Sequence, residues 1–332
     1  MSDKEMYDDL YIRDELADDG SYPNGLGGGC PDMVPRQVAW PGDVRKLLID
    51  KYGEDLGQNV VIGKDNFLYG RVKNLHKTEW RGGDPESSLN VYFMEISTYL
   101  HPEIWMNNRI ASFPLPSIGP GRIEAAGSSS RWSPGALKPP YQHYCLVGQV
   151  VTRQHKNEIP KTSDFEEFWR WVRGNPAIAL HNLTLEPNDP GKKEWHLRLV
   201  NDGKARRHII DVKCERCPVG SVVTIACDSK EPKPPINLSQ VIHDPRLQHV
   251  TMVSVLPAKF DEPLKITFES KAPAHDALLT ISQYVAPKEN EPSLLADAAP
   301  LGTLLADASL TAEAAETSVV NVGRYNIRMM PA

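Results

Sequence analysis

The chain has no apolar run long enough to cross a bilayer, which takes about 20 consecutive apolar residues in a helix. Its first residues, MSDKEMYDDL, lack the basic start and apolar core of a signal peptide. We therefore expect no membrane span. The protein should be cytoplasmic as synthesised, or exported without a cleaved signal peptide.

Basic charge is also scarce. The 332 residues include 37 Lys and Arg against 43 Asp and Glu, which gives a net charge of −6. Phosphate binding needs a basic face, so this balance argues against nucleic acid as a partner. A local basic cluster at 204–208 follows the sequence NDG, and we interpret it as the tip of a hairpin.

Cysteine is rare, and five cysteines cannot form a dense disulfide framework. Cys214 and Cys217 make a CxxC, with Cys227 and His208 nearby in the sequence. One interpretation is a zinc site with three cysteine ligands and one histidine. The other is that the cysteines are small buried strand residues, with Cys217 preceding a turn. The prediction is that the protein needs no cofactor, with zinc as the alternative.

The first twenty residues are rich in aspartate, which suggests a calcium loop. Asp14, Asp18 and Asp19 are the candidate ligands. The spacing lacks the glycine and the terminal glutamate of an EF-hand loop. A solvated acidic loop is the preferred interpretation.

Catalytic motifs are missing too. The chain has no GxSxG, no HExxH, no phosphate-binding loop and no dinucleotide fingerprint. His143 and Cys145 share a strand face, where a buried cysteine is usually inert. We therefore predict that the protein is not an enzyme. A metal-dependent hydrolase using the aspartates or the CxxC is the alternative.

What the chain does contain is turn formers and alternating segments. It has 28 prolines and 23 glycines, which favour many short strands over long helices. Residues 65–76, DNFLYGRVKNLH, alternate as a strand does, and 88–98 and 143–152 resemble its partners. Residues 163–174 predict one amphipathic helix that begins with a capping box. Trp171 lies off its apolar stripe and is a candidate contact residue.

The best domain boundary is the polar segment PNDPG at 187–191. Strand patterns then restart at a spacing of about ten residues, which is typical of a sandwich. The predicted fold is all-β, with two tandem antiparallel immunoglobulin-like sandwiches at 1–188 and 189–332. The first contains the one inserted helix.

An Ala-rich segment at 287–318 interrupts the second pattern. It carries an imperfect repeat, LLADA, in which the leucines are Leu294, Leu295, Leu304 and Leu305. A connection this long is either a tolerated flexible loop or a contact element. The repeated leucines favour contact with a partner.

Several of these segments together resemble a known family. The segments IRDELADDG, DNFLYGRVKN, SLNVYFMEIST, HYCLVGQVV and NPAIALHNLTL, within 8–186, are similar to bacterial adhesion-related (CARDB-like) immunoglobulin-type sandwiches. The sequence departs from the family at 175–177, where NPA stands in place of an expected Asn pair. The second half resembles a bacterial immunoglobulin-like domain. The resemblance implies a fold and no catalytic residues.

These observations favour a non-catalytic structural or interaction protein. Tandem sandwiches would mediate protein–protein contact, adhesion or self-assembly, at a bacterial surface or in a secreted complex, through loops and strand edges. The first alternative is a secreted effector or toxin that binds a host surface. The second is the metal-dependent hydrolase.

Overall fold

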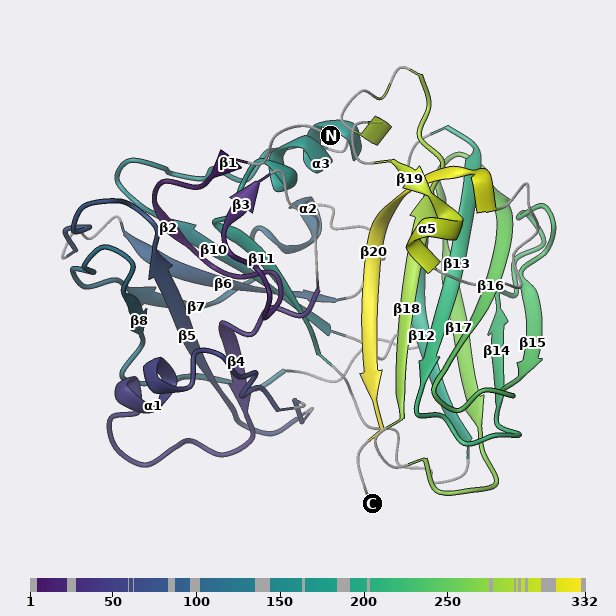
Figure 1. The fold of residues 1–332 in the computed structure, drawn as a ribbon, viewed down its shortest axis with the longest axis horizontal. Helices are drawn as coiled ribbons and strands as arrows, with labels where there is room; N and C mark the ends of the chain where they lie inside the picture. Colours follow the sequence, from purple (N-terminus) through teal and green to yellow (C-terminus); the bar gives the residue numbers. More distant parts are fainter. Residues whose placement is uncertain are drawn as a thin grey trace.

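The computed structural model describes residues 5–22, 28–58, 60–61, 63–82, 87–95, 102–134, 144–162, 165–183, 192–201, 204–274, 277–289, 291, 294–295, 298–305 and 315–329. This part of the chain is mainly antiparallel β-strand, and its helices are short. None of these helices has the length and apolar character needed to cross a membrane. Figure 1 shows two β-rich halves side by side.

Two large sheets and the two-stranded pair β1-β3 form the described N-terminal half. Its elements are β1 (Glu5–Met6), β2 (Leu10–Tyr11), β3 (Ser21–Tyr22), β4 (Met33–Arg36), α1 (Arg45–Asp50), β5 (Asn66–Asn74), β6 (Ser88–Glu95), α2 (Pro102–Trp105), β7 (Arg109–Pro114), β8 (Ile123–Ala125), β9 (Ser130–Trp132), β10 (Tyr144–Val151), α3 (Phe165–Arg173) and β11 (Ile178–Leu183). One sheet has the order β11-β10-β6-β7. In the other, β5 pairs with β2 and β4 along one edge and with β8 and β9 along the opposite edge.

The order of these strands follows a simple count along the chain. We count β2 with β4 as strand 1 and β8 with β9 as strand 5, so that β5, β6, β7, β10 and β11 are strands 2, 3, 4, 6 and 7. One sheet then has the order 1-2-5 and the other 4-3-6-7. The two sheets pack face to face through Leu68 and Val72 of β5 and Leu89 and Val91 of β6. They approach closely at Gly70, where a Cβ would lie 2.5 Å from Leu89 Cδ2. Glycine at this position therefore sets the spacing of the N-terminal core.

The C-terminal half is a second pair of sheets. Its elements are β12 (Lys192–Asn201), β13 (Arg206–Glu215), β14 (Val222–Ala226), β15 (Asn237–Val241), β16 (Leu247–Leu256), β17 (Phe260–Glu269), β18 (Leu278–Val285), β19 (Ala299–Pro300), α5 (Leu301–Leu305) and β20 (Ser318–Arg328). The sheets have the orders β12-β17-β14-β15 and β16-β13-β18-β20-β19. They enclose one core, in which Leu197 and Ile266 of the first sheet belong to the same cluster as Ile210 and Leu279 of the second.

The immunoglobulin-like prediction does not hold for this half. An immunoglobulin sandwich places strands A, B, E and D in one sheet and C, F and G in the other. Here the connections β12–β13, β13–β14, β15–β16, β16–β17 and β17–β18 all cross between the sheets. Alternation of this kind is typical of a double-sheet jelly roll. Strand spacing along the sequence did not distinguish the two, because both need short strands and frequent turns.

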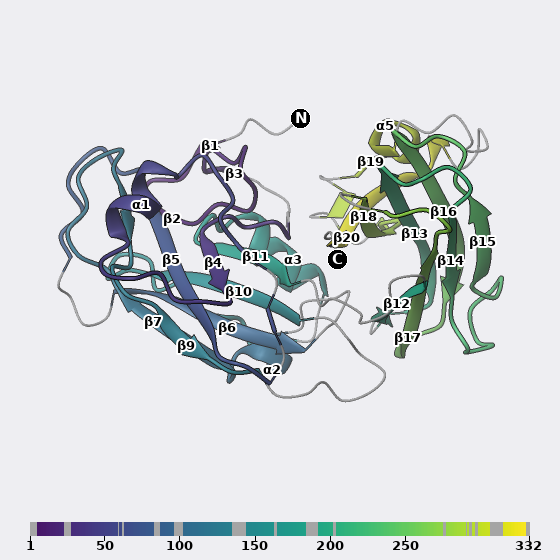
Figure 2. The ribbon, with the colours of Figure 1, turned by 90° about the horizontal axis from the view of Figure 1, so that it is seen from below.

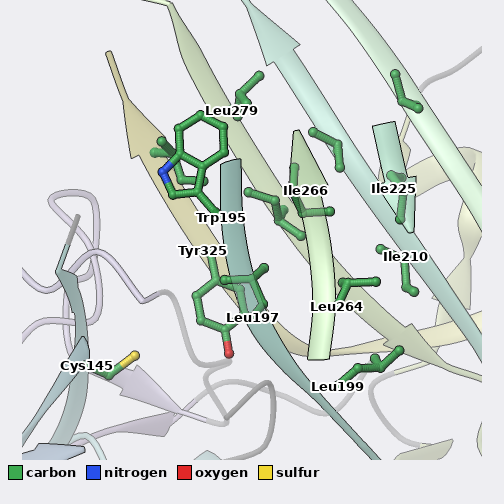
Figure 3. Close-up of a cluster of buried hydrophobic side chains, with 14 of the residues drawn as sticks. Cys145, Trp195, Leu197, Leu199, Ile210, Ile225, Leu264, Ile266, Leu279 and Tyr325 are labelled. Carbon is green, nitrogen blue, oxygen red and sulfur yellow. The ribbon is translucent and has the colours of Figure 1, made fainter. Parts of the chain in front are cut away.

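The hydrophobic core runs across both halves. The sheet β11-β10-β6-β7 buries Leu146 and Ala179 on one face and Val147 and Leu180 on the other. The second face, covered by α2 and α3, joins the core of the C-terminal half. Figure 3 shows Tyr325 and Cys145 at the side of that core where the halves meet. A sheet buried on both faces explains the nearly continuous apolar sequence of β10.

Most predicted strands are confirmed. Residues 65–76, 88–98 and 143–152 contain β5, β6 and β10, which begin and end within a few residues of the prediction, and the predicted helix is α3. The capping box at 163–164 lies outside the described residues. So does the predicted boundary at 187–191, but no described sheet contains strands from both sides of it.

The Ala-rich segment is partly a core element, so the alternative of a flexible loop does not fit its described residues. Leu294 is fully buried beside Val285 and Val320. Leu305 is buried beside Ile209, on the outer face of the sheet that contains β13. The helix α5 therefore covers one end of this sheet.

Candidate functional site

The structure does not gather the predicted zinc ligands. His208 and Cys214 lie six residues apart on the same strand, about 20 Å in an extended chain. His208 Nδ1 is 2.7 Å from Gln283 Nε2, and burial lowers the pKa of this histidine to about 3. Cys214 and Cys217 are neighbours in space, but Cys227 follows the far end of β14. Within the described residues no group of three or more His, Cys, Asp or Glu side chains could hold a metal ion.

The candidate calcium ligands are occupied by the backbone instead. Asp18 accepts hydrogen bonds from the amides of Asp14 and Gly20, at 2.9 and 2.8 Å, and Asp19 accepts one from Ser21 at 2.9 Å. Burial raises the pKa of the Asp14 carboxyl well above its ordinary range, so this side chain is not stabilised as an anion. These aspartates fix the turn between β2 and β3.

The predicted contact residues fall into three groups by exposure. Leu294 and Leu305 are buried in the protein itself, which corrects their assignment as partner contacts. Leu295 and Leu304 are exposed. Trp171 is half-buried and packs against Phe168, with ring centroids 6.0 Å apart. Trp171 is thus mainly a packing residue of α3.

The N-terminal half contains a buried charge cluster that the sequence did not predict. Asp32 accepts hydrogen bonds from Arg13 Nε at Oδ2 and from Arg13 Nη2 at Oδ1, at 3.0 and 2.6 Å, and Arg71 Nε lies 3.1 Å from the same Oδ1. Tyr52 stacks on Arg13, with the guanidinium carbon 3.4 Å from the ring centroid. Arg71 Nη1 also donates to Lys51 O at 2.9 Å. The cluster ties β2, β4 and β5 to the segment after α1, which is a structural role.

Two histidine–carboxylate pairs have the geometry that general bases use. Asp9 Oδ2 lies 2.6 Å from both His155 Nδ1 and Thr152 Oγ1. Asp211 is held in the same way, by His249 at 2.9 Å and Thr251 at 2.7 Å. His249 is buried. His155 is half-exposed; its ring nitrogen Nδ1 contacts Asp9, and the Thr152 hydroxyl accepts from its backbone amide rather than bonding to the ring. Both pairs join segments distant in the sequence.

The feature with most potential for binding is the side of the C-terminal half that points away from the N-terminal half. Strands β12 and β20 face the N-terminal half, whereas β15 and β16 are the last strands at the opposite side of their sheets. We call β15, β16 and the turn at Val219 the distal edge. Strand β15 pairs with β14 alone among the described strands.

The hydrogen bonds of β15 show which of its groups remain available. Cys227 donates to Ile236 O at 2.9 Å, and Ile242 donates to Ser221 O at 2.8 Å. Since such pairs alternate along an antiparallel ladder, Leu238 and Gln240 also bond to β14. The amides of Asn237, Ser239 and Val241 therefore point outward, and their side chains are exposed.

Strands β15 and β16 carry no acidic, lysine or arginine side chain, and exposed apolar residues lie at their ends. Val219, Val241 and Leu247 are 62%, 40% and 42% exposed, and they gather at one end of β15. Gln248 joins these segments by donating to Val241 O at 2.9 Å. Neither β15 (NLSQV) nor β16 (LQHVTMVSVL) contains Lys, Arg, Asp, Glu or Pro. Natural edge strands commonly carry such residues, which prevent pairing with other chains.

Comparison with known proteins adds no function. No family model and no curated protein matches the chain, so the resemblance to adhesion-related sandwiches stays a prediction. Among solved structures, CfaE, the adhesive subunit of the CFA/I fimbria of enterotoxigenic Escherichia coli, aligns with 9% identity over 97% of this chain and 93% of its own. Fet3p, a multicopper oxidase that functions in iron import, aligns with 9% identity over 79% of this chain and 44% of its own. The TM-scores, 0.21 and 0.18, are too low to support an argument.

Proposed function

We propose that this protein is a non-catalytic interaction protein that assembles by pairing the distal edges of two copies. The observation that carries the proposal is the row of outward amides on β15, a strand that contains no charged residue. The amides of Asn237, Ser239 and Val241 point away from β14, and exposed apolar residues lie beside them. Such an edge is a template for adding a strand.

A second copy fits this edge for two reasons. An antiparallel pair of identical strands has a two-fold axis, which places each residue opposite its counterpart on the other side of the axis. With the axis at Ser239, Asn237 of one copy faces Val241 of the other. Identical charges would then meet and repel, but β15 has none.

The apolar residues also suit a two-fold contact. Val241 and Leu247 mark one end of the distal edge, and the exposed Val255 marks the other. A two-fold axis through Ser239 brings the first end of each copy toward the second end of its partner. One contact would then bury the apolar residues at both ends of the distal edge in each copy.

Fold-level assignment supports the same class of function. We propose that the N-terminal half is an immunoglobulin-type sandwich. If strands 1 to 7 are lettered A to G, the orders 1-2-5 and 4-3-6-7 keep A beside B, C beside F and F beside G. The difference from a constant-type domain is that the fourth strand, D, lies beside C. The C-terminal half is a jelly-roll sandwich. Both architectures commonly serve as binding modules, although fold alone does not define activity.

The test is the association state of two matched variants. Ser239→Pro removes an outward amide without breaking a bond to β14, whereas Ser239→Ala keeps that amide and removes only the hydroxyl. In sedimentation velocity over a range of concentrations, we expect the wild type and Ser239→Ala to associate and Ser239→Pro to stay monomeric with an unchanged circular dichroism spectrum. A wild type that is monomeric at every concentration would refute the proposal.

A further inference from the structure

The CxxC at the end of β13 is not used by the proposed assembly, and its geometry differs from that of the other cysteines. Cys214 ends the core face of β13, and Cys217 follows in the turn that leads to β14. Each thiol donates to a backbone carbonyl, Cys214 Sγ to Val212 O at 3.6 Å and Cys217 Sγ to Glu215 O at 3.7 Å, and the two side chains interact with each other. Between them Arg216 has a φ of 56°, a left-handed conformation that turns the chain back so that both sulfurs face inward.

The local environment distinguishes the two thiols. The interaction with Cys214 lowers the pKa of the Cys217 thiol against the opposing effect of burial, and the nearby Arg216 acts in the same direction as Cys214. Burial raises the pKa of the thiols of Cys30, Cys145 and Cys227. Cys217 is therefore the thiol best prepared to react as a thiolate, with Cys214 as its neighbour.

Access to the pair requires only a local opening. Both side chains are buried in the core cluster, and Cys217 lies in the turn whose Arg216 and Val219 are exposed. Turns of this kind open at low free-energy cost compared with the core strands. A small reagent can thus reach Cys217 without unfolding of the sheets.

We propose that Cys214 and Cys217 form a redox-active dithiol that exchanges with small-molecule disulfides such as glutathione disulfide. The Cys217 thiolate attacks one sulfur of the disulfide and displaces one glutathione thiolate, which leaves a mixed disulfide on Cys217. Cys214 then attacks the Cys217 sulfur and displaces the second glutathione, and its proton passes to that leaving thiolate. Two protein thiols are oxidised to one disulfide, and one glutathione disulfide is reduced to two glutathiones.

Oxidation would also fasten part of the distal edge. Cys214 is paired in register with Gln248 of β16, and Glu215 with Leu247. The disulfide would join the turn that carries Val219 to this end of the sheet. The proposal does not depend on self-association, since the thiol contact lies within one chain.

The experiment equilibrates the full-length protein with glutathione at a series of reduced-to-oxidised ratios, followed by acid quenching, alkylation and peptide mapping. We expect the two thiols of Cys214 and Cys217 to be lost together and a peptide linking them to appear. Cys227→Ser should have the same midpoint as the wild type. Cys217→Ser should lose the transition.

Two results would overturn the proposal. One is full alkylation of Cys214 and Cys217 at the most oxidising ratio in the folded wild type. The other is a glutathione adduct on Cys227 while the pair remains reduced. Because the peptide map of the wild type identifies the modified residues directly, the conclusion does not depend on whether Cys217→Ser folds.

Discussion

Individual buried charges hold together the most irregular part of the N-terminal half. Asp32 is fully buried between Arg13 and Arg71, which are themselves buried. Charges removed from water in this way are tolerated only when they are paired. Nothing in the local sequence indicates the pairing, because Arg13 and Asp32 are 19 residues apart.

Removal of this carboxylate tests its role. Asp32→Asn keeps the shape of the side chain but leaves two buried guanidinium groups without a counter-charge. We expect the free energy of unfolding, measured by urea denaturation, to fall by about 3–5 kcal/mol. Asp261→Asn, at the exposed pair with Arg198, should cost less than about 1 kcal/mol. Equal effects of the two variants would contradict the assigned role.

His208 predicts a pH dependence of stability. Burial and then Arg206 lower its pKa from 6.5 to about 3 in the folded protein. As the pH falls below about 6.5, the unfolded chain binds a proton that the folded protein does not, so stability is lost with decreasing pH. From pH 8 to pH 5 this single group should account for about 2 kcal/mol.

The measurement compares wild type with His208→Gln by urea denaturation at both pH values. The difference between the two proteins should change by this amount, with the wild type losing more at pH 5. A difference that is independent of pH would show that His208 is not buried in its neutral form. Its nearness to the CxxC in the sequence predicts a zinc ligand, whereas its actual partner, Gln283, lies 75 residues away and leaves no local pattern.

At the scale of elements, the two leucines that end α5 differ in exposure. Leu305 is 4% exposed and Leu304 is 45% exposed, although they are adjacent. Leu305→Ala should lower the free energy of unfolding by about 2–5 kcal/mol, because it removes a buried side chain. Leu304→Ala should change it by less than about 1 kcal/mol. If thermal or urea denaturation gave the reverse order, the packing of α5 on β13 would be wrong.

Which elements could be predicted depended on burial. β5, β6 and β10 alternate or are continuously apolar because at least one face is buried, and the sequence shows this directly. β15, by contrast, follows closely on the prolines at 232, 234 and 235. Only Leu238 of its five residues packs against the core, so it has little apolar pattern. The one signal available was the run of five residues without Gly, Pro or charge.

At the scale of the whole molecule, the two halves are separate in their sheets but joined in their core. The sheet that contains β10 has one face in each hydrophobic cluster. The strand pattern that restarts after 187–191 predicts the second half, but it does not predict how the two halves pack together. Strand spacing predicted two sandwiches, but the path of the chain between sheets depends on contacts over long sequence distances. That path placed β15 and β16 on the side opposite the N-terminal half.

The most direct test of the assembly is amide hydrogen exchange along β15 at low and high protein concentration. The amides of Leu238 and Gln240 bond to β14 and should be protected at both concentrations. The amides of Asn237, Ser239 and Val241 should exchange quickly at low concentration and become protected at high concentration. If association occurs while these three amides exchange equally fast at both concentrations, the contact lies elsewhere and the proposed pairing of distal edges is wrong.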